Sequence, residues 1–402
     1  MLRATTYSAA ASIHVGLRLN IVSKLLSTLV CFAALAAHSA FASPRGDEPS
    51  FHVIGYVSDA GKLPPISARK LDVINFAFAK VNPQHEVFLP GSTAPRSLAA
   101  LTALHKDNPK LKVVLSIGGW GAGNFSEAAA TASARKIFID TSTALMLAHD
   151  LDGLDIDWEY PTQPGPGISH SPADRVNFSL LLEELRARLD ALGRKPRRHY
   201  LLTIAAADGR AAQGLDLARI AKALDWINLM TYDFYGSLNR TTGHHAGLRA
   251  SALAPAEGRN ATRAVDEFLA GGVPPRKINL GLAFYGRRFG DVAPEHDGLY
   301  QPFASDGGYV TWQQIQREFL NKDGLDKGGF VRHWDEAAQS AWLWNATERK
   351  MISYDDPQAL KAKAAFVRER GLGGVMYWEQ STDPDETLLD VVRATLLHPA
   401  SP

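Results

Sequence analysis

The chain contains almost no cysteine, since Cys31 is the only one in 402 residues. It lies inside an apolar run near the N-terminus, so a chain cleaved after that run would hold no thiol. Disulfides, zinc–thiolate sites and cysteine nucleophiles are thereby excluded from the mature protein. A lipid anchor on Cys31 is disfavoured, because Thr28, Leu29 and Val30 are bulkier than the residues that usually precede such a site.

The chain also lacks an excess of charge of either sign. Its 43 lysines and arginines nearly balance 42 aspartates and glutamates, which leaves a formal charge of +1. A basic face on the scale needed to bind a phosphate backbone is therefore missing, and we expect no nucleic-acid partner. The charge balance favours an uncharged partner.

The apolar run from Leu25 to Ala37 is shorter than the roughly 20 residues that span a bilayer. Arg18 and Lys24 precede it, and the small residues Ala40 and Ala42 around Phe41 suit a signal peptidase. Residues 1–42 are therefore predicted to form a signal peptide rather than a membrane anchor. We expect a secreted or periplasmic protein with no stable membrane anchor after the signal is removed.

Dinucleotide-binding glycine motifs are absent as well. Short β-branched and aromatic runs alternate with stretches of helical apolar spacing, which is the pattern of repeated βα units. No Gly-x-Gly-x-x-Gly follows any of these runs, which disfavours a Rossmann-like sheet. Eight units in a chain of this size favour an α/β fold of the (β/α)8 TIM barrel type. The predicted strands are His52–Val57, Val73–Phe78, Val113–Ile117, Leu154–Asp157, Leu201–Ala205, Trp226–Met230, Ile278–Ala283 and Gly374–Trp378.

Two helix boundaries can be predicted from capping residues. One helix should span Ala173–Leu192 and stop at Gly193, a natural C-terminal cap. Another should begin behind Asp355-Asp356-Pro357, where an aspartate can cap and the proline can occupy the first turn.

The connection between the seventh and eighth strands is too long for an ordinary βα loop. We therefore predict a small α+β insertion subdomain at residues 290–345, and a catalytic barrel made of residues 50–289 and 346–399. The aromatic residues of the insertion could build a small core or one wall of a cleft. They are Tyr300, Phe303, Tyr309, Trp312, Phe330, Trp334, Trp342 and Trp344.

Three acids share one face of the fourth predicted strand. Alternation along an extended chain sends Asp155, Asp157 and Glu159 to one side, and the apolar residues between them to the other. In a barrel the acids would point inward near the C-terminal mouth, where barrel enzymes place catalysis. Three close carboxylates cannot all ionise cheaply, so at least one should have a raised pKa, as a general acid needs. Glu159, nearest the mouth, is the candidate acid.

Two other interpretations of the acids remain. A structural cluster without function is disfavoured, because burying unpaired carboxylates is costly. A Ca²⁺ or Mg²⁺ site is also disfavoured, since calcium loops turn sharply on glycine and polar residues, whereas Ile156 and Trp158 interleave these acids in a strand-like pattern.

This segment resembles the signature of the family 18 glycoside hydrolases, which include many chitinases. The match runs from Asp152 to Glu159 with the sequence DGLDIDWE. Four further segments agree in the expected order: Ser116–Trp120 (SIGGW), Met230–Phe234 (MTYDF), Tyr285–Arg287 (YGR) and Met376–Glu379 (MYWE). The resemblance covers almost the whole chain after the predicted signal. The predicted insertion is similar to the α+β insertion domain of the chitinases that have a deep cleft.

The resemblance implies a secreted chitinase that hydrolyses β-1,4 linkages of N-acetylglucosamine polymers with retention, the sugar supplying the nucleophile. Glu159 would protonate the glycosidic oxygen and later activate water. Asp157 would orient the acetamido group, Asp155 would share a proton with Asp157, and Tyr232 would donate a hydrogen bond to the acetamido oxygen. The implied partners are chitin or N-acetylglucosamine oligosaccharides.

The resemblance also implies substrate contacts. Trp378 would form the aromatic floor beneath the sugar at the cleavage point, and Trp120 would line a neighbouring subsite. Trp158 and Trp226 are better explained as core residues. The other implied substrate-binding residues are Gly119, Tyr160, Met230, Asp233, Tyr285 and Arg287, although Arg287 could instead pair with an acid.

The loop after the sixth strand departs from the family pattern at His245, where relatives often have asparagine. Both residue types form hydrogen bonds, so the departure concerns a cleft contact only. A zinc site on His244 and His245 is disfavoured, because adjacent residues do not usually converge on one metal. We expect neither a metal nor a cofactor, and we expect a monomer.

Two alternatives to a chitinase stay open. A non-catalytic chitin-binding barrel would keep the cleft and lose the acid, but Glu159, Asp157 and Tyr232 are all present. An enzyme of the same fold could instead act on glycoproteins as an endo-N-acetylglucosaminidase, or on peptidoglycan. The inserted subdomain and the tryptophans favour a long chitin-like polymer by analogy only.

Overall fold

A closed ring of parallel strands organises the chain. The computed structural model describes residues 51–321 and 327–397, so the predicted signal peptide lies outside the described residues. The barrel strands follow the order β1-β14-β8-β7-β6-β5-β4-β2, and β2 pairs back onto β1. This closure, with helices between the strands, confirms the predicted (β/α)8 barrel.

All eight predicted runs became barrel strands. β-branched and aromatic residues dominate them, and such residues pack well in the buried strands of a parallel sheet. The barrel strands are β1 (His52–Ser58), β2 (Val73–Val81), β4 (Lys112–Gly118), β5 (Gly153–Asp157), β6 (Leu201–Ala206), β7 (Trp226–Leu229), β8 (Ile278–Ala283) and β14 (Gly374–Trp378). A short strand, β3 (Val87–Phe88), adds to β2 in the antiparallel direction.

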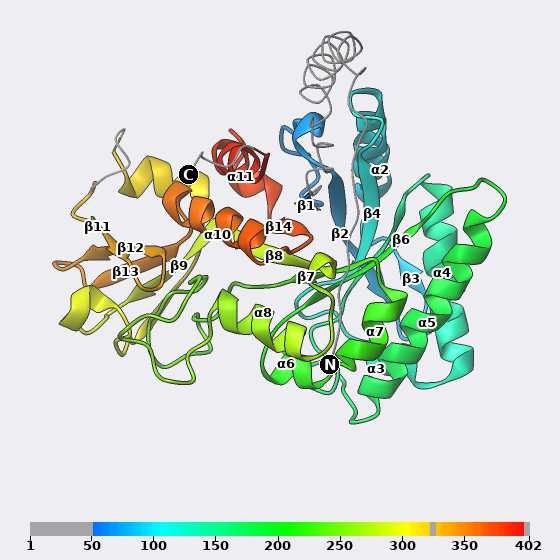
Figure 1. Ribbon diagram of the computed structural model, residues 1–402, viewed down its shortest axis with the longest axis horizontal. Coiled ribbons are helices and arrows are strands. Elements are labelled where there is room, and N and C mark those ends of the chain that lie inside the picture. The colour runs from blue at the N-terminus through cyan, green and yellow to red at the C-terminus, as the bar shows by residue number, and fades with distance from the viewer. Residues whose placement is uncertain (1–50, 322–326, 398–402) are drawn as a thin grey trace, which may run out of the picture. The chain divides into compact units, whose positions relative to one another are not determined.

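Helices connect the strands and lie around the barrel (Figure 1). No helix in the described part of the chain is long and apolar enough to cross a bilayer. The α-helices are α2 (Ala94–Ala103), α3 (Phe125–Ala130), α4 (Ala132–Ala148), α5 (Asp174–Gly193), α6 (Arg210–Gln213), α7 (Leu217–Ala223), α8 (Ala261–Ala270), α9 (Trp312–Gln314), α10 (Pro357–Glu369) and α11 (Thr387–Leu397). Single turns are η1 (Ala68–Lys70), η2 (Leu104–Lys106), η3 (Pro275–Lys277), η4 (Glu295–Gly298), η5 (Ile315–Phe319) and η6 (Gln380–Thr382).

The capping signals located the two predicted helices. Helix α10 begins at Pro357, and the Asp356 side chain accepts a hydrogen bond from the Ala359 backbone N–H, as an N-cap does. Helix α5 runs one residue further than predicted, because Gly193 is its last helical residue and Arg194 follows as the cap.

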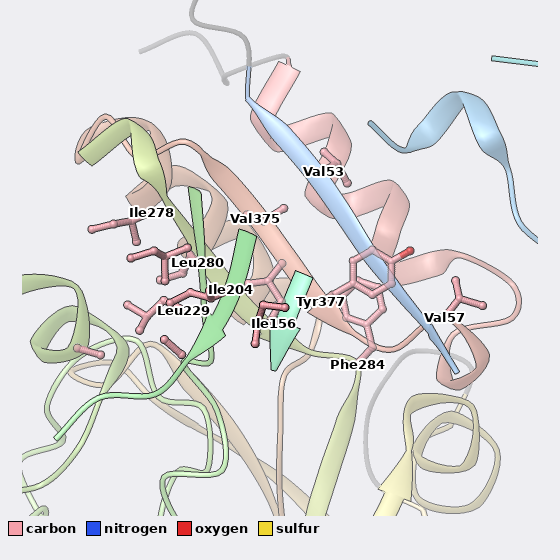
Figure 2. Packing of buried hydrophobic residues seen from close by; sticks show 14 of the residues in the cluster. Val53, Val57, Ile156, Ile204, Leu229, Ile278, Leu280, Phe284, Val375 and Tyr377 are labelled. Carbon is pink, nitrogen blue, oxygen red and sulfur yellow. The ribbon is translucent and has the colours of Figure 1, made fainter. Parts of the chain in front are cut away.

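Two apolar clusters occupy the two sides of the barrel wall. The larger lies between strands and helices and includes Leu154, Ile156 and Trp158. Figure 2 shows part of it, with Val53 and Val57 of β1, Ile156 of β5 and Tyr377 of β14 among the labelled side chains. The smaller cluster fills the barrel interior with residues such as Tyr56, and Phe78, Tyr160 and Trp378 pack against it. The alternation predicted for β5 is therefore confirmed for its apolar side.

A second, antiparallel sheet has the order β10-β9-β13-β12-β11. Its strands are β9 (Tyr285–Gly290), β10 (Ser305–Thr311), β11 (Val331–Asp335), β12 (Ser340–Asn345) and β13 (Lys350–Tyr354). In Figure 1 the yellow and orange strands lie together, close to α10. The sheet begins and ends outside the predicted range 290–345. Its strand β9 follows the seventh barrel strand, β8, after one residue, and β13 extends to Tyr354 and pairs with β9. The division into a catalytic barrel and an insertion subdomain stays a proposal.

Candidate active site

The three acids of the fourth βα unit lie at the C-terminal end of β5. Asp155 and Asp157 are the third and fifth residues of this strand, and Glu159 follows two residues later. All three are buried, with exposed fractions of 0%, 5% and 9%. The strand thus brings the predicted carboxyl groups together at the end of the barrel where parallel-barrel enzymes carry out chemistry.

Asp155 is held inside the barrel by four side-chain donors. Its Oδ2 accepts hydrogen bonds from the Tyr56 hydroxyl at 2.8 Å and the Ser116 hydroxyl at 2.7 Å. Its Oδ1 accepts from the Thr203 hydroxyl at 2.6 Å and from the Asn228 amide at 3.3 Å. Burial raises the pKa of Asp155, and these hydrogen bonds oppose the rise. Asp155 therefore does not face the cleft but anchors the acid group from below.

Asp157 has an unmet hydrogen-bonding capacity. Its Oδ1 atom is buried and has no hydrogen-bond partner in the described part of the chain, and the Asp155 oxygens are occupied by other donors. Burial, together with the charges of Glu159 and Asp155, raises the pKa of Asp157 well above its ordinary value. A buried polar atom without a partner costs free energy, so this oxygen is suited to a polar group of a ligand.

Glu159 has the acid strength that proton transfer near neutral pH requires. Burial is the main cause that raises its pKa from 4.5 to about 7, and the charge of Asp233 adds to the rise. A hydrogen bond with Tyr160 and the positive charge of Lys80 oppose it. Both the protonated and the ionised form are therefore populated near neutrality, as a group that first donates and then accepts a proton needs.

A cleft of about 700 Å³ opens above these acids. It contains both Asp157 and Glu159 and receives side chains from the barrel and from the second sheet. Its lining is Tyr56, Phe78, Lys80, Trp120, Asp157, Glu159, Tyr160, Ala205, Ala207, Met230, Tyr232, Asp233, Gly236, Ser237, Leu238, Asn239, Arg259, Tyr285, Arg287, Tyr309 and Trp378.

Aromatic rings form much of the cleft floor. The Trp378 ring stacks on Phe78 with centroids 5.6 Å apart and an interplanar angle of 14°, and it lies 5.8 Å from the Tyr56 ring. Trp120 is 56% exposed and meets Tyr160 edge-on at 6.4 Å. An exposed tryptophan beside a cleft offers an apolar face on which a pyranose ring can lie.

Tyr232 is buried beside the acids and keeps its proton. Burial, followed by the charge of Asp157, raises its pKa well above the ordinary value. The hydroxyl lies 3.7 Å from the sulfur of Met376, a weak acceptor. Tyr232 can therefore donate a hydrogen bond into the cleft. Met230, two residues earlier in the chain, also lines the cleft.

Asp233 and Arg287 form a paired wall where the barrel meets the second sheet. The guanidinium donates two hydrogen bonds of 2.7 Å, one to each carboxylate oxygen. The His245 Nδ1 atom lies 3.6 Å from Asp233. Desolvation acts to raise the pKa of Asp233, but His245 and Arg287 hold it below its ordinary value. Arg287 thus pairs with an acid and lines the cleft at the same time.

The two adjacent histidines do not converge on one site. His244 Nε2 lies 3.1 Å from Asp335 of β11, whereas His245 faces Asp233. Among residues 51–321 and 327–397, no cluster of three histidine, cysteine or acidic side chains could hold a metal ion.

Gly119 does not line the cleft. It is buried with a φ of +87°, and a Cβ atom at this position would overlap the Phe78 ring. Its lack of a side chain lets Phe78 pack beneath Trp378, so it shapes the floor without touching the cleft. Asp155 is the other predicted site residue outside the lining.

Sequence reasoning missed several lining residues. Tyr56 lies in a predicted strand and alternates with Val57 of the outer cluster, so period-two spacing could have found it. Lys80 follows an irregular step in the pairing of β2 with β4, which alternation cannot anticipate. Tyr309 comes from β10 of the second sheet, and Arg259 from a loop; neither carries a local signal in the sequence.

Comparisons with known proteins show the family of the chain. The sequence model of a family described as Glycosyl hydrolases family 18 matches residues 52–383. Chitinase A1 of Niallia circulans is 38% identical over 307 residues, covering 74% of this chain and 44% of the relative. Chitinase 1 of Aphanocladium album is 35% identical over 296 residues, covering 72% of this chain and 66% of the relative. The chain thus spans between about half and two thirds of the length of these relatives.

Solved structures of related enzymes also match most of the chain. A family 18 N-acetylglucosaminidase from Paenibacillus barengoltzii is 37% identical with a TM-score of 0.79, covering 86% of this chain and 99% of that one. A chitinase from Bacillus thuringiensis is 30% identical with a TM-score of 0.80, covering 88% and 71%. With the barrel, the acids and the family match over most of its length, the chain belongs to family 18 of the glycosyl hydrolases.

Proposed function

We propose that the chain hydrolyses β-1,4 linkages next to N-acetylglucosamine units in chitin or its oligosaccharides. The observation that carries this proposal is the pair of buried acids in the cleft, Asp157 with an unpartnered oxygen and Glu159 with a pKa of about 7. The chitinases among the relatives support the choice of substrate.

The proposed reaction uses the sugar as its own nucleophile. Glu159 transfers its proton to the glycosidic oxygen while the 2-acetamido oxygen attacks the anomeric carbon and the glycosidic bond breaks. The resulting oxazolinium intermediate has its charge balanced by Asp157, and Tyr232 donates a hydrogen bond to the acetamido oxygen. Ionised Glu159 then takes a proton from a water molecule, and the water oxygen attacks the anomeric carbon. The oxazolinium ring opens, and the product has the same anomeric configuration as the substrate. Asp155 acts through Asp157: its charge helps to raise the pKa of Asp157. A proton shared between these two carboxyl groups is part of the proposal.

The other lining residues hold the sugar in this geometry. Trp378 would lie beneath the ring at the cleavage point, and Trp120 beneath a neighbouring ring. Five further residues would contact the substrate from the cleft walls: Tyr160, Met230, Asp233, Tyr285 and Arg287. Their place in the cleft lining supports this sequence-based assignment. Export through a signal peptide at residues 1–42 and a monomeric state belong to the same proposal.

A second candidate is the release of single N-acetylglucosamine units. The structure from Paenibacillus barengoltzii, which the chain matches almost from end to end, carries the name N-acetylglucosaminidase. The chemistry would be the same, and product length distinguishes the two activities.

Hydrolysis of N-acetylated chitin oligosaccharides tests the proposal, with the anomeric form of fresh products read by NMR. The protein should give β-anomers, and Glu159→Gln should lower kcat by about 10² to 10⁴, the usual contribution of a general acid. Glu369→Gln, at the exposed end of α10, should retain full activity. Release of α-anomers, or an active Glu159→Gln, would contradict the mechanism. Dimeric products indicate a chitinase and monomers the second candidate.

A further inference from the structure

Lys80 brings a positive charge to the cleft floor. The pairing between β2 and β4 shifts register between Ala77 and Ala79, and beyond this shift Lys80 faces the cleft. Its Nζ donates a hydrogen bond of 2.6 Å to the Gly118 carbonyl oxygen and lies 5.1 Å above the Phe78 ring. The side chain is half-buried, so the ammonium lies at the boundary between wall and cleft.

Lys80 is the cleft cation that no carboxylate neutralises by direct contact. Three basic residues line the cleft. Arg287 forms its two hydrogen bonds with Asp233, and Arg259 is paired with Asp208. Within the described part of the chain, Lys80 takes part in no salt bridge. Its ammonium has three N–H donors, and the Gly118 carbonyl oxygen accepts from one of them. Two donors are therefore free to act on a ligand.

The acids that could attract a cationic ligand are largely neutralised. Arg287 compensates Asp233 directly. Burial raises the pKa of both Asp157 and Glu159, which reduces the negative charge that they present to the cleft. Lys80 acts electrostatically on both, and its own pKa is lowered by burial while these acids oppose the decrease. A second cation placed near Lys80 would meet repulsion that the acids do not offset fully.

We propose that Lys80 is a specificity-determining residue, whose free ammonium disfavours sugar units with a free, protonated amine beside the cleavage point and so selects N-acetylated units there. This proposal rests on the proposed function, because it concerns the same cleft and polymer. An acetamide is neutral and can accept a hydrogen bond from Lys80, whereas the ammonium of glucosamine offers only donors and a like charge. The Lys80 ammonium is bonded to the Gly118 carbonyl and lies above the Phe78 ring, so the affected unit is one that lies over this part of the cleft floor.

The test uses partially deacetylated chitosan oligosaccharides at mildly acidic pH, where the free amines are protonated. Products of the wild-type protein, Lys80→Met and Lys80→Arg are sequenced from both new ends. In Lys80→Met, the fraction of free-amine units directly beside the cleaved bond or one unit further should rise about tenfold, the order expected for two like charges at a partly buried site. Lys80→Arg keeps the charge and should keep the wild-type pattern.

Each outcome separates the two proposals. Substrate assistance requires an N-acetylated unit at every new reducing end in all three proteins, so free amines there would overturn the proposed function. Equal free-amine fractions at the other flanking positions in wild type and Lys80→Met would overturn the role of Lys80. If Lys80→Met fails to fold, Lys80→Gln replaces it, because its amide can still donate to Gly118.

A pH profile gives an independent readout. Since Lys80 lowers the pKa of Glu159, its loss should move the high-pH limb of kcat/KM upward, and Lys80→Arg should restore the limb. A purely structural role would lower activity without moving this limb, and such a result would count against the proposal.

Discussion

Asp233 couples the acid catalyst to the second sheet. Its carboxylate holds Arg287 with two hydrogen bonds and faces His245, while its negative charge raises the pKa of Glu159. One side chain therefore links the geometry of the cleft wall to the ionisation of the proton donor. The sign of its effect on the pH dependence can be worked out from these contacts.

Glu159 must be protonated to donate, so activity should fall as pH rises through about 7. Asp233→Asn removes a negative charge and leaves Arg287 uncompensated, and both changes favour the ionised form of Glu159. The pKa of Glu159 should therefore fall, and the high-pH limb of kcat/KM should move to lower pH. A pH–rate profile on chitin oligosaccharides measures the shift.

The matched control is Asp266→Asn, whose carboxylate pairs with Arg370 outside the cleft. Its limb should coincide with that of the wild type. A limb that stays in place or moves upward in Asp233→Asn would show that Asp233 does not set the ionisation of Glu159.

At the scale of elements, α10 is fastened to the barrel by a buried ion pair. Lys363 of α10 donates hydrogen bonds to both oxygens of Asp355, at 2.7 and 2.5 Å, and both side chains are excluded from solvent. The Ala283 N–H, at the end of β8, also donates to Asp355 at 3.3 Å. The pair thus connects the segment that follows β13, the middle of α10 and the end of a barrel strand.

Lys363→Met should destabilise the protein strongly, because it leaves a buried carboxylate without its cation. Removing one partner of such a pair costs about 3–5 kcal/mol in the free energy of unfolding. Urea unfolding measures this change, and the double variant Lys363→Met/Asp355→Asn should recover much of the loss. Lys361→Met, on the exposed side of the same helix, should leave the unfolding midpoint unchanged. A single variant as stable as the wild type would refute the fastening role.

At the scale of the whole molecule, the barrel depends on the pairing of its first and last strands. β1 pairs with β14 from His52 opposite Gly374 onward. A Cβ atom on Gly374 would overlap the backbone of His52, including its carbonyl oxygen. A glycine at this position therefore permits the close approach that closes the ring.

Gly374→Ala should weaken this closure by about 1–3 kcal/mol, the usual cost of forcing extra atoms into a packed site. Denaturant unfolding of the two proteins gives the difference. Gly123→Ala is the control, because no atom lies within 4 Å of the added methyl group. Equal destabilisation by both variants would mean that the loss does not arise from the closure.

The barrel and the central acids could be predicted from local patterns alone. Each strand is a short β-branched or aromatic run followed by a helical period, and period-two alternation decides which side chains share a face. Alternation therefore predicts one site for Asp157 and Glu159, which both line the cleft, and the other side of the wall for Leu154 and Ile156, which lie in the outer cluster. These features depend only on residues close in the chain.

The environment of those acids was decided by tertiary structure. The donors to Asp155 come from β1, β4, β6 and β7, and only closure of the barrel brings Tyr56 and Asn228 to the same carboxylate. Lys80 faces the cleft because of a register shift between β2 and β4. Tyr309 lies on β10, which reaches the cleft because it pairs with β9 in the second sheet. The residue types and their spacing determined the family and the acid. Burial and partners, which set each pKa and the shape of the cleft, depend on contacts between distant segments that no local pattern encodes.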